Sequence, residues 1–140
     1  MSVWTTAFYA RLAGDSGAGG LVSKLATYGT RPAIFSYFPT PEVDGLYVVL
    51  TGNIVSSPDD TKNDRGRTVE RRVYVYGPAT GSTAAIEAAA ERIRFLFHRK
   101  PLTVSGFSVY IAVAEGPIEV PGGDDLYGRM VIVTMTGKES

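Results

Sequence analysis

The chain has 140 residues, a formal net charge of zero, 44% hydrophobic residues and no cysteine. This length and apolar content predict a single domain, residues 1–140, with a substantial core. The absence of cysteine excludes disulfides and cysteine-based metal sites. Nucleic-acid binders normally carry a basic surplus, so the balanced charge disfavours that class and suits self-association. The apolar runs are too short to span a bilayer and no signal peptide opens the chain, which predicts a soluble protein made inside a cell.

The N-terminal part of the chain predicts two short helices joined by a flexible link. Within Val3–Leu12, large apolar residues recur at four-residue spacing, as on one face of a helix: Trp4, Phe8 and Leu12. The link is Asp15–Gly20, DSGAGG, whose glycines favour irregular structure. A second short helix is expected within Leu21–Tyr28.

The next part of the chain predicts strands. Ala33–Phe38 lies between two prolines, which favours a short edge strand. Leu46–Ser56 is a longer strand in which Gly52–Asn53 mark a bulge or kink. Arg67–Tyr76 is also predicted to be a strand, in which every second side chain points to the same side. The residues on one side are Val69, Arg71, Val73 and Val75. These two longer strands are expected to pair antiparallel across the wholly polar Ser57–Gly66, which forms an exposed hairpin tip or a locally disordered segment.

Ser82–Lys100 is the segment that most clearly predicts a helix. Ser82 or Thr83 is expected to cap it through a side-chain hydroxyl, and Pro101 ends it. One apolar stripe follows helical spacing: Ile86, Ala89, Ala90, Ile93 and Phe97.

A second arc of the same helix is also partly apolar. It contains Arg92, Phe95 and Arg99 together with alanines and a leucine: Ala85, Ala88 and Leu96. A sheet covers only one stripe of a helix, so this arc predicts a second packing partner. That partner is either another helix of the chain or a neighbouring subunit.

Two further strands are predicted after the helix. They are Leu102–Val113, with a possible bulge at Gly106, and Leu126–Thr136, joined by a long turn over Glu115–Asp125. The element order predicts an α+β fold with a mainly antiparallel sheet, a long hairpin, and helices packed on one side.

Motifs that carry chemistry were sought and rejected. Gly14–Gly17 reads GDSG, the residues around a chymotrypsin-like nucleophile, but it links two predicted helices, and the single histidine, His98, lies on a polar helix face. Gly17–Gly20 lacks the Lys-Ser or Lys-Thr of a phosphate loop. Asp59–Gly66 lacks the ligand spacing of a calcium loop. Tyrosines on the strands, beside arginines, lack an RNA-binding signature. We therefore expect no catalytic, cofactor or metal site.

Element order and scattered positions along nearly the whole chain carry a family resemblance. The segments are Phe8–Ala13, Leu21–Val22, Pro39–Val49, Asp59–Lys62, Arg65–Arg67, Val73–Tyr76, Glu87–Leu96, Leu102, Gly106 and Leu126–Val133. In these segments the sequence resembles the tail-completion or tail-terminator proteins of long-tailed bacteriophages and related tail-like particles.

The resemblance implies a structural virion protein that is assembled in the host cytoplasm and has no enzymatic activity. Such proteins form a hexameric ring on the head-proximal end of the tail tube, stop tube polymerisation and join the tail to the head connector. The implied partners are further copies of the chain, the major tail tube protein and a head-side neck or stopper protein. DNA passes through the ring without being held. The alternatives are another neck component, such as a stopper or connector, and a host ligand-binding domain or enzyme.

The mixed arc and the polar tip are the predicted interface. A ring contact buries two different patches of each subunit. An arginine at such a contact needs carboxylates or carbonyls around its guanidinium, and a neighbour's tip offers them. The predicted interface residues are Arg92, Phe95, Arg99, Asp59, Asp60, Lys62, Asp64, Arg65 and Arg67.

Overall fold

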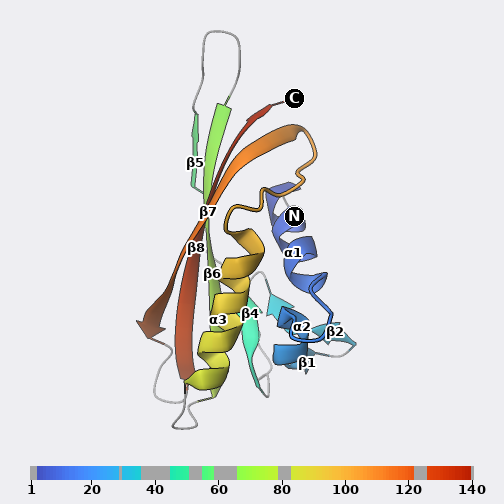
Figure 1. Ribbon diagram of the computed structural model, residues 1–140, viewed down its shortest axis with the longest axis vertical. Helices are drawn as coiled ribbons and strands as arrows, with labels where there is room; N and C mark the ends of the chain where they lie inside the picture. The colour runs from blue at the N-terminus through green and yellow to red at the C-terminus, as the bar shows by residue number, and fades with distance from the viewer. Residues whose placement is uncertain are drawn as a thin grey trace.

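The computed structural model describes residues 3–28, 30–35, 45–50, 55–58, 66–78, 83–121 and 126–139. Its helices all lie on one face of a twisted sheet (Figure 1). The described helices are α1 (Val3–Ala13), α2 (Leu21–Lys24) and α3 (Ala84–Phe97). The described strands are β1 (Thr27–Tyr28), β2 (Arg31–Pro32), β3 (Ile34–Phe35), β4 (Tyr47–Val49), β5 (Val55–Pro58), β6 (Gly66–Pro78), β7 (Phe107–Pro121) and β8 (Leu126–Glu139).

The main sheet has the strand order β3-β4-β6-β8-β7, and β5 pairs with β6 beyond β4. All of its pairings are antiparallel except that of β3 with β4. The predicted α+β class, with a mainly antiparallel sheet and helices on one side, is confirmed. The predicted edge strand is also confirmed, because β3 ends the order on one side.

The predicted antiparallel pairing of the long hairpin is confirmed. Both β4 and β5 pair with β6, with Val49 opposite Tyr74 and Val55 opposite Glu70. The predicted bulge or kink at Gly52–Asn53 lies outside the described residues. Residues 59–65 of the predicted tip lie outside the described residues.

The alternation predicted for Arg67–Tyr76 is confirmed in β6, and β6 and β8 together form the sheet side of the core. Seven inward residues of these strands are buried: Val69, Arg71, Val73, Val75, Val131, Val133 and Met135. Outward tyrosines pack against one another across the strands, as Tyr47 and Tyr76 do with ring centroids 5.7 Å apart. This is the cross-strand packing expected for strand tyrosines.

Strand β7 differs from the prediction in its bounds and in the position of its bulge. It begins at Phe107 and continues to Pro121 through most of the predicted turn. The pairing with β8 shifts between Val109 and Ile111, where one residue of β7 is extra, and again between Glu115 and Ile118. A one-residue bulge reverses the side to which every later residue points. The bulge was expected at Gly106, and the structure places the first extra residue between Val109 and Ile111.

Helix α3 lies where the pattern predicted it. All five residues of the predicted stripe are buried, and Leu96 of the second arc is buried with them. Phe97 packs on Phe8 of α1 with ring centroids 5.0 Å apart. The residue before the helix is Thr83, as expected, but its side chain makes no capping hydrogen bond. The second partner predicted for this helix is therefore, in part, α1 of the same chain.

The N-terminal helices agree with the sequence except at the end of the second. In α1 the three spaced residues are all buried: Trp4, Phe8 and Leu12. Helix α2 stops at Lys24, earlier than predicted, and the chain turns into β1 at Thr27. Between α1 and α3, Arg11 donates to three backbone carbonyls at the end of α3: Leu96 and Lys100, both at 2.8 Å, and Pro101 at 3.1 Å.

We predict that two phenylalanines of one helix differ sharply in their contribution to stability. Phe97 is fully buried, so Phe97→Ala should lower the free energy of unfolding by about 3–5 kcal/mol. Phe95 is 53% exposed, so Phe95→Ala should lower it by less than about 1 kcal/mol. Urea denaturation at a concentration where the chain is monomeric measures both. Equal losses would show that the two faces of α3 were assigned wrongly.

Candidate functional site: the outward face of helix α3

The structure describes three of the predicted interface residues in full. Arg92 and Phe95 lie on the second arc of α3. Arg99 lies just beyond the end of the helix, where its backbone N–H donates to the Ala112 carbonyl of β7 at 2.9 Å. Arg67 is paired in β6 opposite Pro58, and its side chain is outside the described part. The other predicted tip residues also lie outside the described residues: Asp59, Asp60, Lys62, Asp64 and Arg65.

Arg92 has a carboxylate partner in its own chain. Its Nε and Nη2 donate to the two carboxylate oxygens of Asp15, both at 2.8 Å. Two parallel charge-assisted hydrogen bonds are the strongest geometry for such a pair. The partner expected on a neighbour's tip is therefore not needed to satisfy this guanidinium. Asp15, which the sequence placed in a flexible link, fastens that link to α3.

Asp15 also organises the start of α2. Its Oδ2 accepts a hydrogen bond from the backbone N–H of Leu21 at 2.6 Å. The hydrogen bond from Arg92 is the main reason that the pKa of Asp15 lies below its ordinary value, and the Leu21 N–H acts in the same direction against partial burial. The carboxylate is thus held charged between two helices.

Phe95 is an exposed aromatic ring between two cations. The Arg92 guanidinium carbon lies 4.6 Å from its ring centroid and Lys100 Nζ lies 3.1 Å from it. Lys100 Nζ also donates to the Phe95 carbonyl oxygen at 2.6 Å. Arg99 beside it is exposed and makes no ion pair within the described part of the chain. This end of α3 therefore presents an apolar ring within a positively charged surface.

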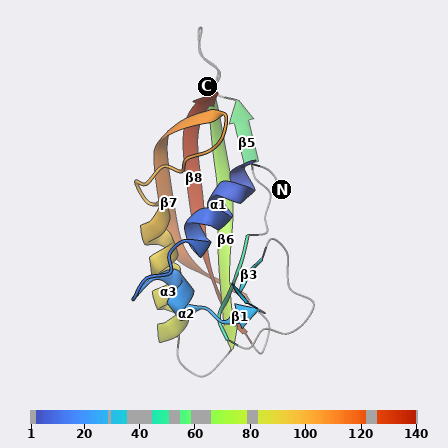
Figure 2. The same cartoon turned by 90° about the vertical axis from the view of Figure 1, so that its right-hand side faces the viewer.

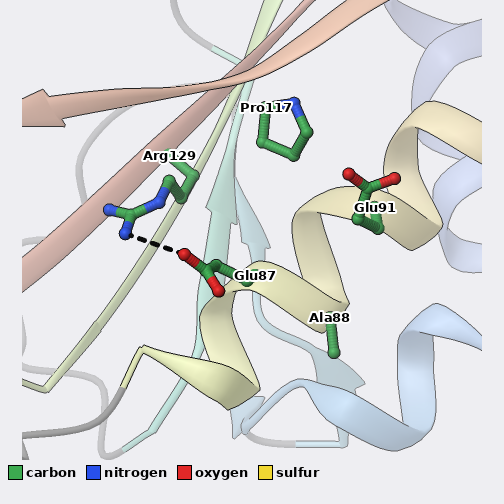
Figure 3. A pocket seen from close by; sticks show the side chains of 5 residues that line it. All are labelled: Glu87, Ala88, Glu91, Pro117 and Arg129. Carbon is green, nitrogen blue, oxygen red and sulfur yellow. Dashed lines mark hydrogen bonds and ion pairs between the residues drawn. The ribbon is translucent and has the colours of Figure 1, made fainter.

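An open pocket of about 350 Å³ lies beside the other end of α3 (Figure 3). Five residues line it: Glu87, Ala88, Glu91, Pro117 and Arg129. Arg129 is buried, and its guanidinium points to Glu87 with a distance of 3.4 Å between Nη2 and Oε1. The lining contains two carboxylates and one guanidinium, so the pocket is mildly acidic. No serine, threonine or histidine side chain lines it.

The residues that resembled a protease signature serve structural roles. Asp15 is bound by Arg92, and His98 Nδ1 accepts the backbone N–H of Ala114 at 3.2 Å. A catalytic histidine needs one nitrogen free for the nucleophile and the other on a carboxylate. His98 instead joins the end of α3 to β7.

The described residues contain no group of three or more His, Asp or Glu side chains that could hold a metal ion. None of their helices is long and apolar enough to cross a bilayer.

Comparison with known proteins finds similarity only in the fold. No family model matches the sequence, and no curated protein matches it. A chain from a solved structure described as the virion of a native gene transfer agent particle superposes with a TM-score of 0.74 at 20% identity, covering 96% of this chain and 93% of that one. A second solved structure, whose name states no function, has a TM-score of 0.57 at 15% identity, covering 99% and 94%.

We predict that the Asp15–Arg92 pair makes stability depend on pH. Because the folded-state pKa of Asp15 is lower than its unfolded value of about 3.9, the pair contributes fully above that pH. The contribution disappears as the pH falls through the folded-state pKa. Asp15→Asn keeps an acceptor for the Leu21 N–H and removes the charge. The urea midpoint of Asp15→Asn should thus lie below that of the wild type at pH 7, and the gap should shrink in acid.

A double-mutant cycle provides the control for this prediction. Arg92→Gln should lower the midpoint at pH 7, and the double variant should lose less than the sum of the two single losses. Additive losses, or a gap between wild type and Asp15→Asn that does not depend on pH, would contradict the pairing.

Proposed function

We propose that this chain is a structural virion protein that forms a hexameric ring on the head-proximal end of a phage-type tail tube. The ring stops tube polymerisation and joins the tail to the head connector, while DNA passes through it. The observation that carries the proposal is the similarity of fold, over nearly the whole of both chains, to a chain of a gene transfer agent virion. The family resemblance of the sequence points in the same direction and adds the tail-terminator role.

The described surface is consistent with an assembly role. The pocket beside α3 contains an ion pair between Arg129 and Glu87. Exposed apolar side chains occur on both layers of the molecule, on α3 and on β7. A closed cyclic contact uses two different patches of one subunit, which requires such features on separate surfaces.

The proposed subunit contact includes Phe95 and Arg99, with Arg92 held beside them by Asp15. Five residues between β5 and β6, and Arg67 at the start of β6, remain part of this proposal. The five are Asp59, Asp60, Lys62, Asp64 and Arg65. The proposed partners outside the ring are the major tail tube protein and a head-side neck or stopper protein. The chain requires no cofactor in this role.

We predict that the purified chain forms six-fold rings and that these bind tail tubes at one end. Native mass spectrometry and negative-stain electron microscopy measure the ring. Adding the chain to growing tubes of the cognate tail tube protein should stop their extension. Rings that bind a purified head connector and leave tube growth unchanged would favour the other neck roles, a stopper or connector. A chain that stays monomeric at high micromolar concentration would contradict the ring.

We predict that reversing the charge of Arg99 disrupts the ring without unfolding the subunit. Arg99 is exposed and makes no ion pair in the described part of the chain, so Arg99→Glu should retain the wild-type circular dichroism spectrum. A reversed charge recurs at each interface of a ring, so assembly should fail. Arg31→Glu, at an exposed residue of β2, is the matched control and should assemble. Rings of full size from Arg99→Glu would remove this residue from the contact.

A further inference from the structure

Exposed apolar side chains gather on one strand of the sheet. Five large hydrophobic residues of the described chain are substantially exposed, and one of them is Phe95. The other four belong to β7: Tyr110 at 56%, Ile111 at 48%, Val113 at 37% and Ile118 at 42%. Scattered single apolar residues are normal on a protein surface, whereas a cluster indicates an interaction site.

The bulge in β7 makes this arrangement costly for an isolated subunit. After the extra residue before Ile111, the small side chains of Ala112 and Ala114 point into the core. The larger, β-branched Ile111 and Val113 point outward. The strand thus turns its larger apolar residues away from the chain's own core. This distribution is favourable only if something covers the outward side.

The outward side of the sheet extends the apolar surface beyond β7. Ile111 and Val113 lie opposite Thr136 and Thr134 of β8, and Ile118 lies opposite Met130. The described helices all pack on the other face (Figure 2). Strand β7 is also at the end of the strand order, so its far edge has no strand partner among the described residues. Around Ala112 and Ala114 the residues that follow α3 cover this edge, because the Arg99 N–H donates to the Ala112 carbonyl and the Ala114 N–H donates to His98 Nδ1. The free surface of β7 is therefore its outward face.

The charges of β7 identify the kind of partner. Its only charged residues are Glu115 and Glu119, both exposed and without an ion pair in the described part of the chain. Glu115 lies opposite Ile132 on the outward side, next to the apolar cluster. The complementary surface, an exposed apolar ring within basic residues, occurs on this same chain around Phe95, Arg99 and Lys100.

We infer that the outward side of β7 binds a second copy of this chain, which contributes the end of its α3. In this contact Ile111, Val113 and Ile118 cover Phe95 of the neighbour, and Glu115 meets Arg99. The two surfaces lie on opposite layers of the subunit, so the contact is head-to-tail and repeats from copy to copy. The inference rests on the proposed function and names the two surfaces that would join in the ring.

The first test removes apolar surface and keeps strand propensity. Threonine is β-branched like valine and isoleucine, so the double variant Val113→Thr, Ile118→Thr should fold normally. Its ring should dissociate at a concentration at least about tenfold higher than that of the wild-type ring, because each interface loses apolar contact. Native mass spectrometry across a dilution series measures this, and circular dichroism checks the fold. An unchanged dissociation concentration in the folded double variant overturns the inference.

The second test reverses the charge at Glu115 and then also reverses the charge of its proposed partner, Arg99. Glu115→Arg should weaken the ring, and adding Arg99→Glu should restore it to within a few-fold of wild type. Glu119→Arg is the matched control. Glu119 lies opposite the buried Arg129, on the side of the strand that faces away from the proposed contact, so this variant should form rings as stable as those of the wild type. Failure of the double variant to recover, or equal weakening by Glu119→Arg, overturns the pairing of Glu115 with Arg99.

These outcomes separate the inference from the proposed function. A wild-type chain that forms no ring contradicts the proposed function. A wild-type ring that persists in the threonine variant and in Glu115→Arg leaves the proposed function intact and rejects β7 as the contact surface.

Discussion

The layer of helices depends on the contact between Arg11 and the end of α3. The last carbonyls of a helix have no N–H donor within it, and the negative end of the helix dipole attracts a cation. The Arg11 guanidinium of α1 meets both needs, because it donates to the Leu96 carbonyl in the last turn of α3 and to the Lys100 and Pro101 carbonyls just beyond the helix. The Asp15–Arg92 pair closes a second link between the same segments. Together these links hold α1, the start of α2 and α3 on the sheet as one layer, which fixes where Phe95 is presented.

A second arginine fixes the position of α1 over the sheet. Arg71 of β6 is 5% exposed and donates to the Thr5 hydroxyl at 2.9 Å and to the Leu50 carbonyl. Its Nε has no partner in the described structure, and burial lowers the pKa of its guanidinium. A buried cation without a carboxylate is costly, so the contacts that it does make are valuable. Sliding α1 by one turn would remove the hydroxyl, and Arg71 therefore specifies one register for the helix.

Periodic patterns in the sequence predicted the fold. They did not predict the one-residue bulge in β7 or the contacts between residues far apart in the sequence. The stripe of α3 and the alternation of β6 are local patterns, and both are confirmed. The phase of β7 depends on one extra residue near Tyr110, which alternation alone does not reveal. Asp15 lay in a glycine-rich link, and its partner is 77 residues away, so no local signal marked it. For the candidate site, the sequence selected Phe95 and Arg99 because they fell outside the core stripe, but it gave no sign of the exposed residues on β7.

A two-layer subunit has an intrinsic problem that a head-to-tail contact solves. Each layer buries one face against the other, and each still has an outer face exposed to water. Here the outer faces differ in chemistry, since β7 is apolar and acidic while the end of α3 is aromatic and basic. Different faces do not match themselves across a two-fold axis, so they favour a contact that passes from one copy to the next. Such a contact ends in a ring only if the rotation at each step closes, and otherwise it grows into a filament. In the proposed role, the ring must therefore bury both the outward side of β7 and the end of α3 of every subunit, so that no apolar surface is left to bind further copies outside the ring.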